Sequence, residues 1–153
     1  MALNKRNISR LTIIAEAGVN HNGKISNALK LVDVASIAKA DYIKFQTFVP
    51  DLLTSKDTRL AKYQKKNISE DSHLKMLKKL ALSEQDLKKI INRCLKKRIK
   101  FMSSPFDFES IKFLKKLNIK KIKIPSGEIT NIPYLRKIGS LNRKIILSTG
   151  MSN

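Results

Sequence analysis

The sequence predicts an α/β fold in which about five β/α units follow one another along a parallel sheet. Short apolar runs of strand length alternate with amphipathic helical segments, and polar residues gather where the apolar runs end. An open doubly wound sheet and a (β/α) barrel both fit this alternation. No GxGxxG or GxxxxGK[ST] pattern occurs in the 153 residues, so neither a Rossmann nor a P-loop nucleotide site is indicated.

Five segments have the length and composition of buried strands. They are residues 11–15, 41–47, 99–103, 120–124 and 144–147. The first runs into the polar cluster Glu16, Asn20, His21, Asn22 and Gly23. Packing alone seldom explains so dense a polar cluster after a buried strand, and α/β folds place their chemistry at the carboxyl ends of strands.

The segments between the strands have helical periodicity. The predicted helices are residues 25–39, 73–80, 83–98, 108–117 and 131–138. Ser83 and Asp86 match a capping box, and Asp107 can cap the helix that follows it. Residues 48–72 have no clear periodicity, and so long a loop in a compact domain is often functional. Cys94 lies on the apolar stripe of its helix and is interpreted as a buried hydrophobic residue.

Composition limits the classes of function. The net charge of +20 suggests nucleic-acid binding, but lysine outnumbers arginine 25 to 7 and no aromatic array interleaves the basic residues. Proteins that recognise specific nucleic-acid bases favour arginine over lysine, so a specific nucleic-acid function is not expected. The longest apolar runs are too short for a membrane span. With one cysteine and no secretion signal, a cytoplasmic protein is expected.

The polar residues at the predicted strand ends describe an anion site. They are Glu16, Lys44, Ser103, Ser104, Lys123, Ser126, Ser148 and Thr149. A lysine within apolar strand sequence is costly unless it is paired or meets an anion. Two such lysines with hydroxyl donors therefore predict a phosphate or carboxylate ligand.

Structural alternatives stay open for several of these residues. Lys123 alternates with isoleucines and could mark a solvated face, and Glu16 could simply pair with a nearby lysine. His21 could cap a turn through its ring nitrogens. The two histidines, His21 and His73, lie far apart without a supporting carboxylate pattern, so the residues predict no metal site.

Five motifs in order resemble the N-terminal barrel of the N-acetylneuraminate (sialic acid) synthase family. They are EAGVNHNG at 16–23, KFQT at 44–47, SSPF at 103–106, KIPSGE at 123–128 and LSTGM at 147–151. The resemblance implies a (β/α)8 TIM-barrel fold. It also implies an enzyme that condenses phosphoenolpyruvate with N-acetylmannosamine or a related N-acetylated aldose. Carbon 3 of phosphoenolpyruvate attacks the aldehyde, water adds at carbon 2, phosphate leaves, and a nine-carbon 2-keto acid sugar results.

The resemblance also implies residue roles. Lys44, Ser104, Lys123, Ser126 and Ser148 match phosphoenolpyruvate-binding positions, Glu16 matches a carboxylate near the reacting carbons, and Asn67 matches an acceptor-sugar contact. A divalent metal, Mn²⁺ or Mg²⁺, is implied for the complete enzyme, which is expected to be a homodimer. Ser104 stands where many members have threonine, which keeps the hydroxyl, and Pro125 stands where a small residue is usual.

We expect residues 1–153 to be an incomplete, inactive N-terminal part of such a barrel. The C-terminal half-barrel, the metal ligands and the antifreeze-like domain of the family are expected to be absent from it. A legionaminate- or pseudaminate-type synthase fits the motifs as an alternative. Two further alternatives are a Schiff-base aldolase using Lys44 or Lys123 and a non-catalytic basic binding module.

Overall fold

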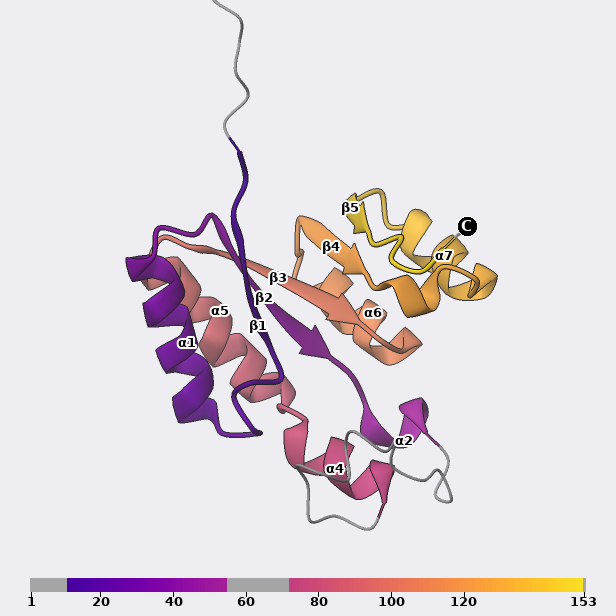
Figure 1. The fold of residues 1–153 in the computed structure, drawn as a ribbon, viewed down its shortest axis with the longest axis horizontal. Coiled ribbons are helices and arrows are strands. Elements are labelled where there is room, and N and C mark those ends of the chain that lie inside the picture. Colours follow the sequence, from indigo (N-terminus) through magenta and orange to yellow (C-terminus); the bar gives the residue numbers. More distant parts are fainter. Residues whose placement is uncertain (1–10, 55–71, 153) are drawn as a thin grey trace, which may run out of the picture.

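The computed structural model describes residues 11–54 and 72–152. Within them five parallel strands form one sheet in the order β1-β2-β3-β4-β5. The strands are β1 (Ile14–Gly18), β2 (Tyr42–Thr47), β3 (Lys100–Pro105), β4 (Lys121–Ile124) and β5 (Lys144–Leu147). A doubly wound sheet reverses its strand order at a switch point, whereas a barrel adds each strand beside the last. The sequential order therefore selects the barrel, of which this sheet is a part (Figure 1).

The helices connect successive strands. They are α1 (Ile25–Ile37), α2 (Pro50–Leu53), α4 (His73–Leu80), α5 (Glu84–Lys96), α6 (Phe108–Lys116), the 3-10 turn η1 (Ser126–Glu128) and α7 (Ile132–Gly139). Of these, α1, α5, α6 and α7 pack on one face of the sheet. The predicted caps of α5 and α6 are confirmed, because Ser83 Oγ accepts from the Asp86 amide and Asp107 Oδ1 from the Ser110 amide. Every described helix is too short or too polar to span a bilayer.

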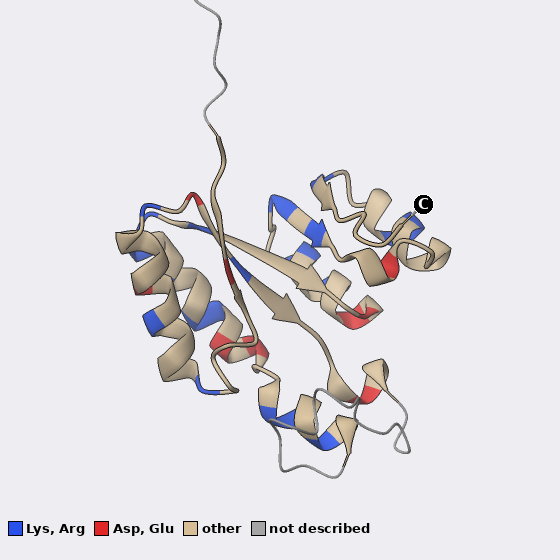
Figure 2. Ribbon diagram, viewed as in Figure 1, with Lys and Arg blue, Asp and Glu red and all other residues tan. Residues whose placement is uncertain are grey.

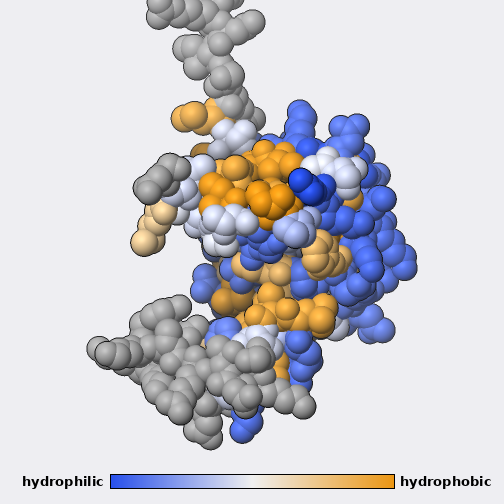
Figure 3. All heavy atoms as spheres, turned by 90° about the vertical axis from the view of Figure 1, so that its right-hand side faces the viewer, coloured by the Kyte–Doolittle hydropathy of each residue, from blue (hydrophilic) through white to orange (hydrophobic). Residues whose placement is uncertain are grey.

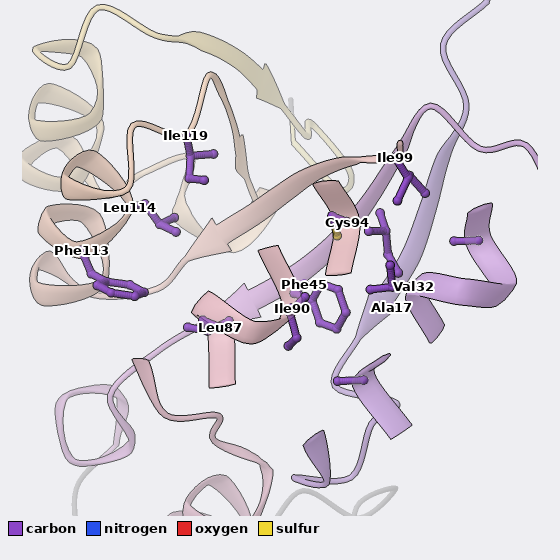
Figure 4. Close-up of a cluster of buried hydrophobic side chains, with 13 residues drawn as sticks. Ala17, Val32, Phe45, Leu87, Ile90, Cys94, Ile99, Phe113, Leu114 and Ile119 are labelled. Atoms are coloured by element: carbon purple, nitrogen blue, oxygen red, sulfur yellow. The ribbon is translucent and has the colours of Figure 1, made fainter. Parts of the chain in front are cut away.

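Two clusters of buried side chains hold the helices on the sheet. The larger joins α1, α5 and α6 to β1 and β2 and includes Val32, Phe45, Ile90 and Leu114, with Cys94 buried among them as predicted (Figure 4). Burial raises the pKa of the Cys94 thiol to about 12, so the thiol stays protonated. The smaller cluster joins α6 and α7 to β4.

The structure corrects three details of the predicted elements. Strand β1 is Ile14–Gly18 and not residues 11–15, with Leu11 and Ile13 exposed before it, so Glu16 lies within the strand and not after its end. The aperiodic stretch after β2 contains the one-turn helix α2. Strand β3 extends to Pro105, so Ser103 and Ser104 lie within the strand and not at the end of one over residues 99–103.

Gly23 marks the closest approach between the loop after β1 and helix α4. Its φ is +71°, and a Cβ built there would lie 1.9 Å from the Lys79 carbonyl oxygen. Figure 1 shows α4 next to the end of the sheet where β1 leads into α1. The loop can therefore reach α4 only with glycine at this position.

We expect Gly23→Ala to lower the free energy of unfolding by about 3 kcal/mol, because left-handed strain and a backbone clash add. Gly18→Ala tests the backbone strain alone, since Gly18 has φ +52° with no atom near its Cβ position. It should lower the free energy of unfolding by about 1 kcal/mol. Gly139→Ala, in open space, is the control. Denaturant unfolding measures all three, and equal effects at Gly18 and Gly23 would contradict the clash.

Candidate functional site

Alternate residues of each strand point away from the helices and form the inner face of the sheet. In β2 the buried residues Ile43, Phe45 and Thr47 face the helices, so Tyr42, Lys44 and Gln46 face inward. The register pairs Glu16 with Lys44 and Gln46 with Ser104. In β4, Ile122 and Ile124 join the core, which leaves Lys121 and Lys123 on the inner face. The predicted site residues Glu16, Lys44, Ser104 and Lys123 thus share one face.

Glu16 and Lys44 form an ion pair across neighbouring strands. The Lys44 Nζ lies 2.8 Å from the Glu16 carboxylate, so Glu16 does pair with a nearby lysine, and this contact is compatible with both a structural and a catalytic role. The two partners differ in exposure, with 12% of the Lys44 side chain accessible and 59% of the Glu16 side chain. The carboxylate therefore remains open to a ligand while the ammonium lies deeper.

Lys123 is the second inner-face cation of the site. Its Nζ donates to the Ser148 hydroxyl and to the Ile124 carbonyl oxygen, the latter at 3.4 Å. Burial lowers the pKa of Lys123, the positive charge of Lys44 lowers it further, and Glu16 opposes both effects. The two ammoniums are thus close enough to repel each other, and a bound anion would relieve that repulsion.

Hydroxyl groups surround the two lysines, and one of them lacks a partner. Ser104 is 1% exposed, and its Oγ has no hydrogen-bond partner among the described residues. A buried hydroxyl without a partner is suited to donate a hydrogen bond to an acceptor atom of a ligand. Ser126 and Ser148 lie at neighbouring strand ends, since a Cβ on Gly150 would come 3.9 Å from Ser126 Oγ and the Ser148 amide bonds to Ile124.

The neighbouring serine has a structural role instead. Ser103 points to the helical side, where its hydroxyl lies 2.7 Å from Thr47 Oγ1 and donates to the Phe45 carbonyl oxygen at 3.2 Å. Of the predicted strand-end residues, Ser103 is therefore separated from the site. Gln46, which the sequence analysis did not single out, lies on the inner face in register with Ser104. Gln46 could have been predicted from the sequence, because residues two apart in a strand point to the same face and Gln46 follows Lys44 by two.

Other predicted features have mixed outcomes. His21 caps its turn as proposed, because its Nδ1 accepts the Gly23 amide at 3.1 Å. Asn67 lies outside the described residues. No group of three or more His, Cys, Asp or Glu within residues 11–54 and 72–152 could hold a metal ion, so the residues present do not fit a metal centre.

A cavity of about 570 Å³ lies apart from this site. Its lining includes Phe48, Leu82, Leu87 and Phe113, which belong to the helical side of the sheet. None of the predicted site residues that the structure describes lines it. The basic residues within 11–54 and 72–152 are also dispersed, since Figure 2 shows Lys and Arg spread over α1, α4, α5 and β4.

Known proteins share this sequence and fold. N,N'-diacetyllegionaminic acid synthase from Campylobacter jejuni is 49% identical over 95% of the chain and 44% of its own length. The enzyme of the same name from Legionella pneumophila is 50% identical over 91% of the chain and 39% of its own length. The chain thus spans less than half the length of these relatives.

A solved structure and a family model agree with these relatives. The crystal structure of N-acetylneuraminic acid (sialic acid) synthetase from Leptospira borgpetersenii, in complex with citrate, superposes with a TM-score of 0.77. It is 28% identical and covers 94% of this chain and 46% of its own. The model of the NeuB family matches residues 31–153. On the fold, the strand-end residues and these matches, the chain belongs to the NeuB family.

Proposed function

We propose that this chain forms the phosphoenolpyruvate-binding part of a sugar-acid synthase that joins phosphoenolpyruvate to an N-acetylated aldose. The observation that carries the proposal is that Lys44 and Lys123 share the inner face, with Lys44 near enough for its positive charge to lower the pKa of Lys123. Phosphoenolpyruvate brings a phosphate and a carboxylate, and two ammoniums with hydroxyl donors match such a ligand.

Each inner-face residue has a role in the proposal. Lys44 and Lys123 bind the anionic groups, and the hydroxyls of Ser104, Ser126 and Ser148 donate hydrogen bonds to their oxygens. The exposed Glu16 carboxylate handles a proton or orients the acceptor. In the proposed reaction, carbon 3 of phosphoenolpyruvate forms a bond to the aldehyde carbon, water adds at carbon 2 and phosphate leaves. The products are a nine-carbon 2-keto acid sugar and inorganic phosphate.

The relatives favour one acceptor class over another. Two bacterial relatives at 49% and 50% identity are named N,N'-diacetyllegionaminic acid synthases. A pseudaminic acid synthase from Campylobacter jejuni is 33% identical. We therefore place the six-carbon diacetamido precursor of legionaminic acid ahead of both N-acetylmannosamine and the pseudaminate precursor.

We further propose that catalysis needs polypeptide beyond residues 1–153. Strand β5 is left uncovered on the helix-bearing face of the sheet, because Ile145 and Leu147, which pair with the core residues Ile122 and Ile124, are 40% and 46% exposed, and apolar surface gathers on this side of the molecule (Figure 3). On this proposal the closing strands carry the ligands of a divalent metal, Mn²⁺ or Mg²⁺, and the complete enzyme is a cytoplasmic homodimer. We assign no step to the metal, because the described residues do not fit it.

Complementation tests the proposed function. The chain is mixed with the portion of the Campylobacter jejuni relative that lies beyond the matched region, and Mn²⁺, phosphoenolpyruvate and each acceptor are added. We expect phosphate and keto-acid release from the mixture, faster with the diacetamido acceptor, and none from the chain alone. Failure of the chain to bind phosphoenolpyruvate would contradict the proposal, and turnover by the chain alone would contradict the need for further polypeptide.

A Schiff-base aldolase is the second candidate, because the pKa of Lys123 is lowered and neutral amines form imines with carbonyl substrates. Borohydride reduction in the presence of pyruvate separates the two candidates by mass spectrometry. The synthase proposal predicts no covalent adduct. A stoichiometric adduct on Lys123 or Lys44 would favour the aldolase.

A further inference from the structure

His21 is a buried polar residue to which the proposed reaction gives no role. It is 1% exposed and lies in the turn that follows β1. Its Nδ1 accepts the Gly23 amide at 3.1 Å, and its ring also bonds to the Gly18 backbone carbonyl. Because Nδ1 accepts from the Gly23 amide, the ring proton is assigned to Nε2, which is then the nitrogen able to donate to Gly18. Burial lowers the pKa of His21, so the imidazole is neutral at pH 7.

The carbonyl that His21 holds belongs to a β-bulge. Glu16 pairs with Lys44 and Gly18 pairs with Phe45, so Ala17 is an extra residue in β1. The His21 ring packs on Phe45, with the ring centroids 6.0 Å apart. His21 therefore contacts both strands at the bulge, one through a hydrogen bond and the other through its ring. Bulges next to active sites re-aim the side chains beside them.

Besides His21, the backbone after Glu16 is held by the pairing of Gly18 with Phe45 and by the Asn20 amide, which donates to the Ala17 carbonyl oxygen. Ala17 is buried in the core, but Gly18 has no atom within 4 Å of its Cβ position. The Glu16 side chain is 59% exposed, and its described contact is the ion pair with Lys44. An exposed ion pair alone holds a side chain weakly, so the direction of Glu16 depends on the backbone of the bulge.

We propose that His21 is a positioning residue that locks the bulged end of β1 and thereby keeps the Glu16 carboxylate on the Lys44 ammonium. Part of this inference rests on the proposed function, because it makes the Glu16–Lys44 pair part of the phosphoenolpyruvate site. The contact between the two side chains can be tested without any ligand. The two questions are therefore separable.

Two isosteric substitutions separate the two hydrogen bonds of His21. Glutamine places an amide nitrogen near the Nε2 position and can still donate to the Gly18 carbonyl, whereas asparagine places an amide near Nδ1 and reaches only the Gly23 side. His21→Ala removes both bonds. His73→Gln, at the chain's other histidine, is the control.

The readout is the nuclear Overhauser effect between the Lys44 ε-protons and the Glu16 γ-protons. We expect it in the wild type, in His73→Gln and in His21→Gln, and we expect its loss in His21→Ala and His21→Asn. Each variant is first confirmed as folded by the dispersion of its amide spectrum; an unfolded His21→Ala leaves the His21→Gln and His21→Asn pair to decide. Retention of the contact in His21→Asn, or its loss in His21→Gln, would overturn the inference.

A double-mutant cycle tests whether the positioning of Glu16 by His21 affects phosphoenolpyruvate binding. Removing the Glu16 charge from beside Lys44 with Glu16→Gln should tighten phosphoenolpyruvate binding about two- to fivefold. His21→Asn should tighten it by a similar factor alone and add nothing in the Glu16→Gln background, because both act through one contact. Additive effects would contradict the positioning role. Absence of any phosphoenolpyruvate binding in the wild type would instead contradict the proposed function and leave the Overhauser test decisive.

Discussion

Replacing Glu16 by glutamine is expected to lower turnover of the complemented synthase about 100-fold or more, with the Michaelis constant for phosphoenolpyruvate changed far less. Glutamine keeps the size of the side chain but cannot exchange a proton. Glu16 lies on the inner face beside Lys44, and more than half of its side chain is open to solvent. A carboxylate so placed can reach the reacting carbons, whereas the deeper lysines bind the substrate.

A matched exposed glutamate serves as the control for this change. Glu109 on α6 pairs with Lys112 at 2.7 Å on the helical surface, so Glu109→Gln should leave turnover unchanged. Initial rates of phosphate release measure both variants. A loss of less than a few-fold in Glu16→Gln would mean that Glu16 is only a structural partner of Lys44.

Lys123→Met and Lys44→Met are each expected to weaken phosphoenolpyruvate binding about 10- to 100-fold. Methionine keeps most of the apolar stem and removes the ammonium, and a hydrogen bond to a charged group contributes about 1.5–3 kcal/mol. Binding to each variant is measured by isothermal titration calorimetry. Lys120→Met removes an exposed lysine from the residue before β4 and should bind as the wild type does.

The pH dependence of the same binding reports on Lys123. Its pKa is lowered by burial and by Lys44, so the ammonium loses its proton at a lower pH than an ordinary lysine. We therefore expect phosphoenolpyruvate affinity to fall as the pH rises through that lowered pKa, and this fall to be absent in Lys123→Met. Equal pH profiles in the wild type and Lys123→Met would exclude Lys123 from the site.

Much of the fold could be predicted from the sequence because periodicity and caps are local signals. Helix α4 and strand β5 have the predicted bounds. The predicted start of β1 was wrong because Ile13 is apolar, as a buried strand residue would be, but is exposed just before β1, which is an edge strand of the described sheet. The choice between barrel and open sheet needed the strand order, which local periodicity does not contain.

The sequence could predict which strands carry the site residues, but not how the side chains of those residues lie relative to one another. Alternation places Lys44 and Lys123 on one face, yet their mutual influence depends on strand register. The outward turn of Ser103 and the unpartnered hydroxyl of Ser104 likewise follow from pairing with β2. The bulge beside Glu16 adds one residue to β1 alone, and no pattern in the sequence marked it.

The most direct test of the central claim is a titration of the ¹⁵N-labelled chain with phosphoenolpyruvate, followed by amide chemical shifts. The account predicts saturable shifts concentrated at the carboxyl ends of the strands, at Ser104, at residues 126–128 and at residues 148–150. Amides of α1 and α5, which carry Lys30, Lys88, Lys89 and Lys96 away from the inner face, should not move. Shifts spread over those helices, or none at millimolar phosphoenolpyruvate, would contradict a phosphoenolpyruvate site on the inner face.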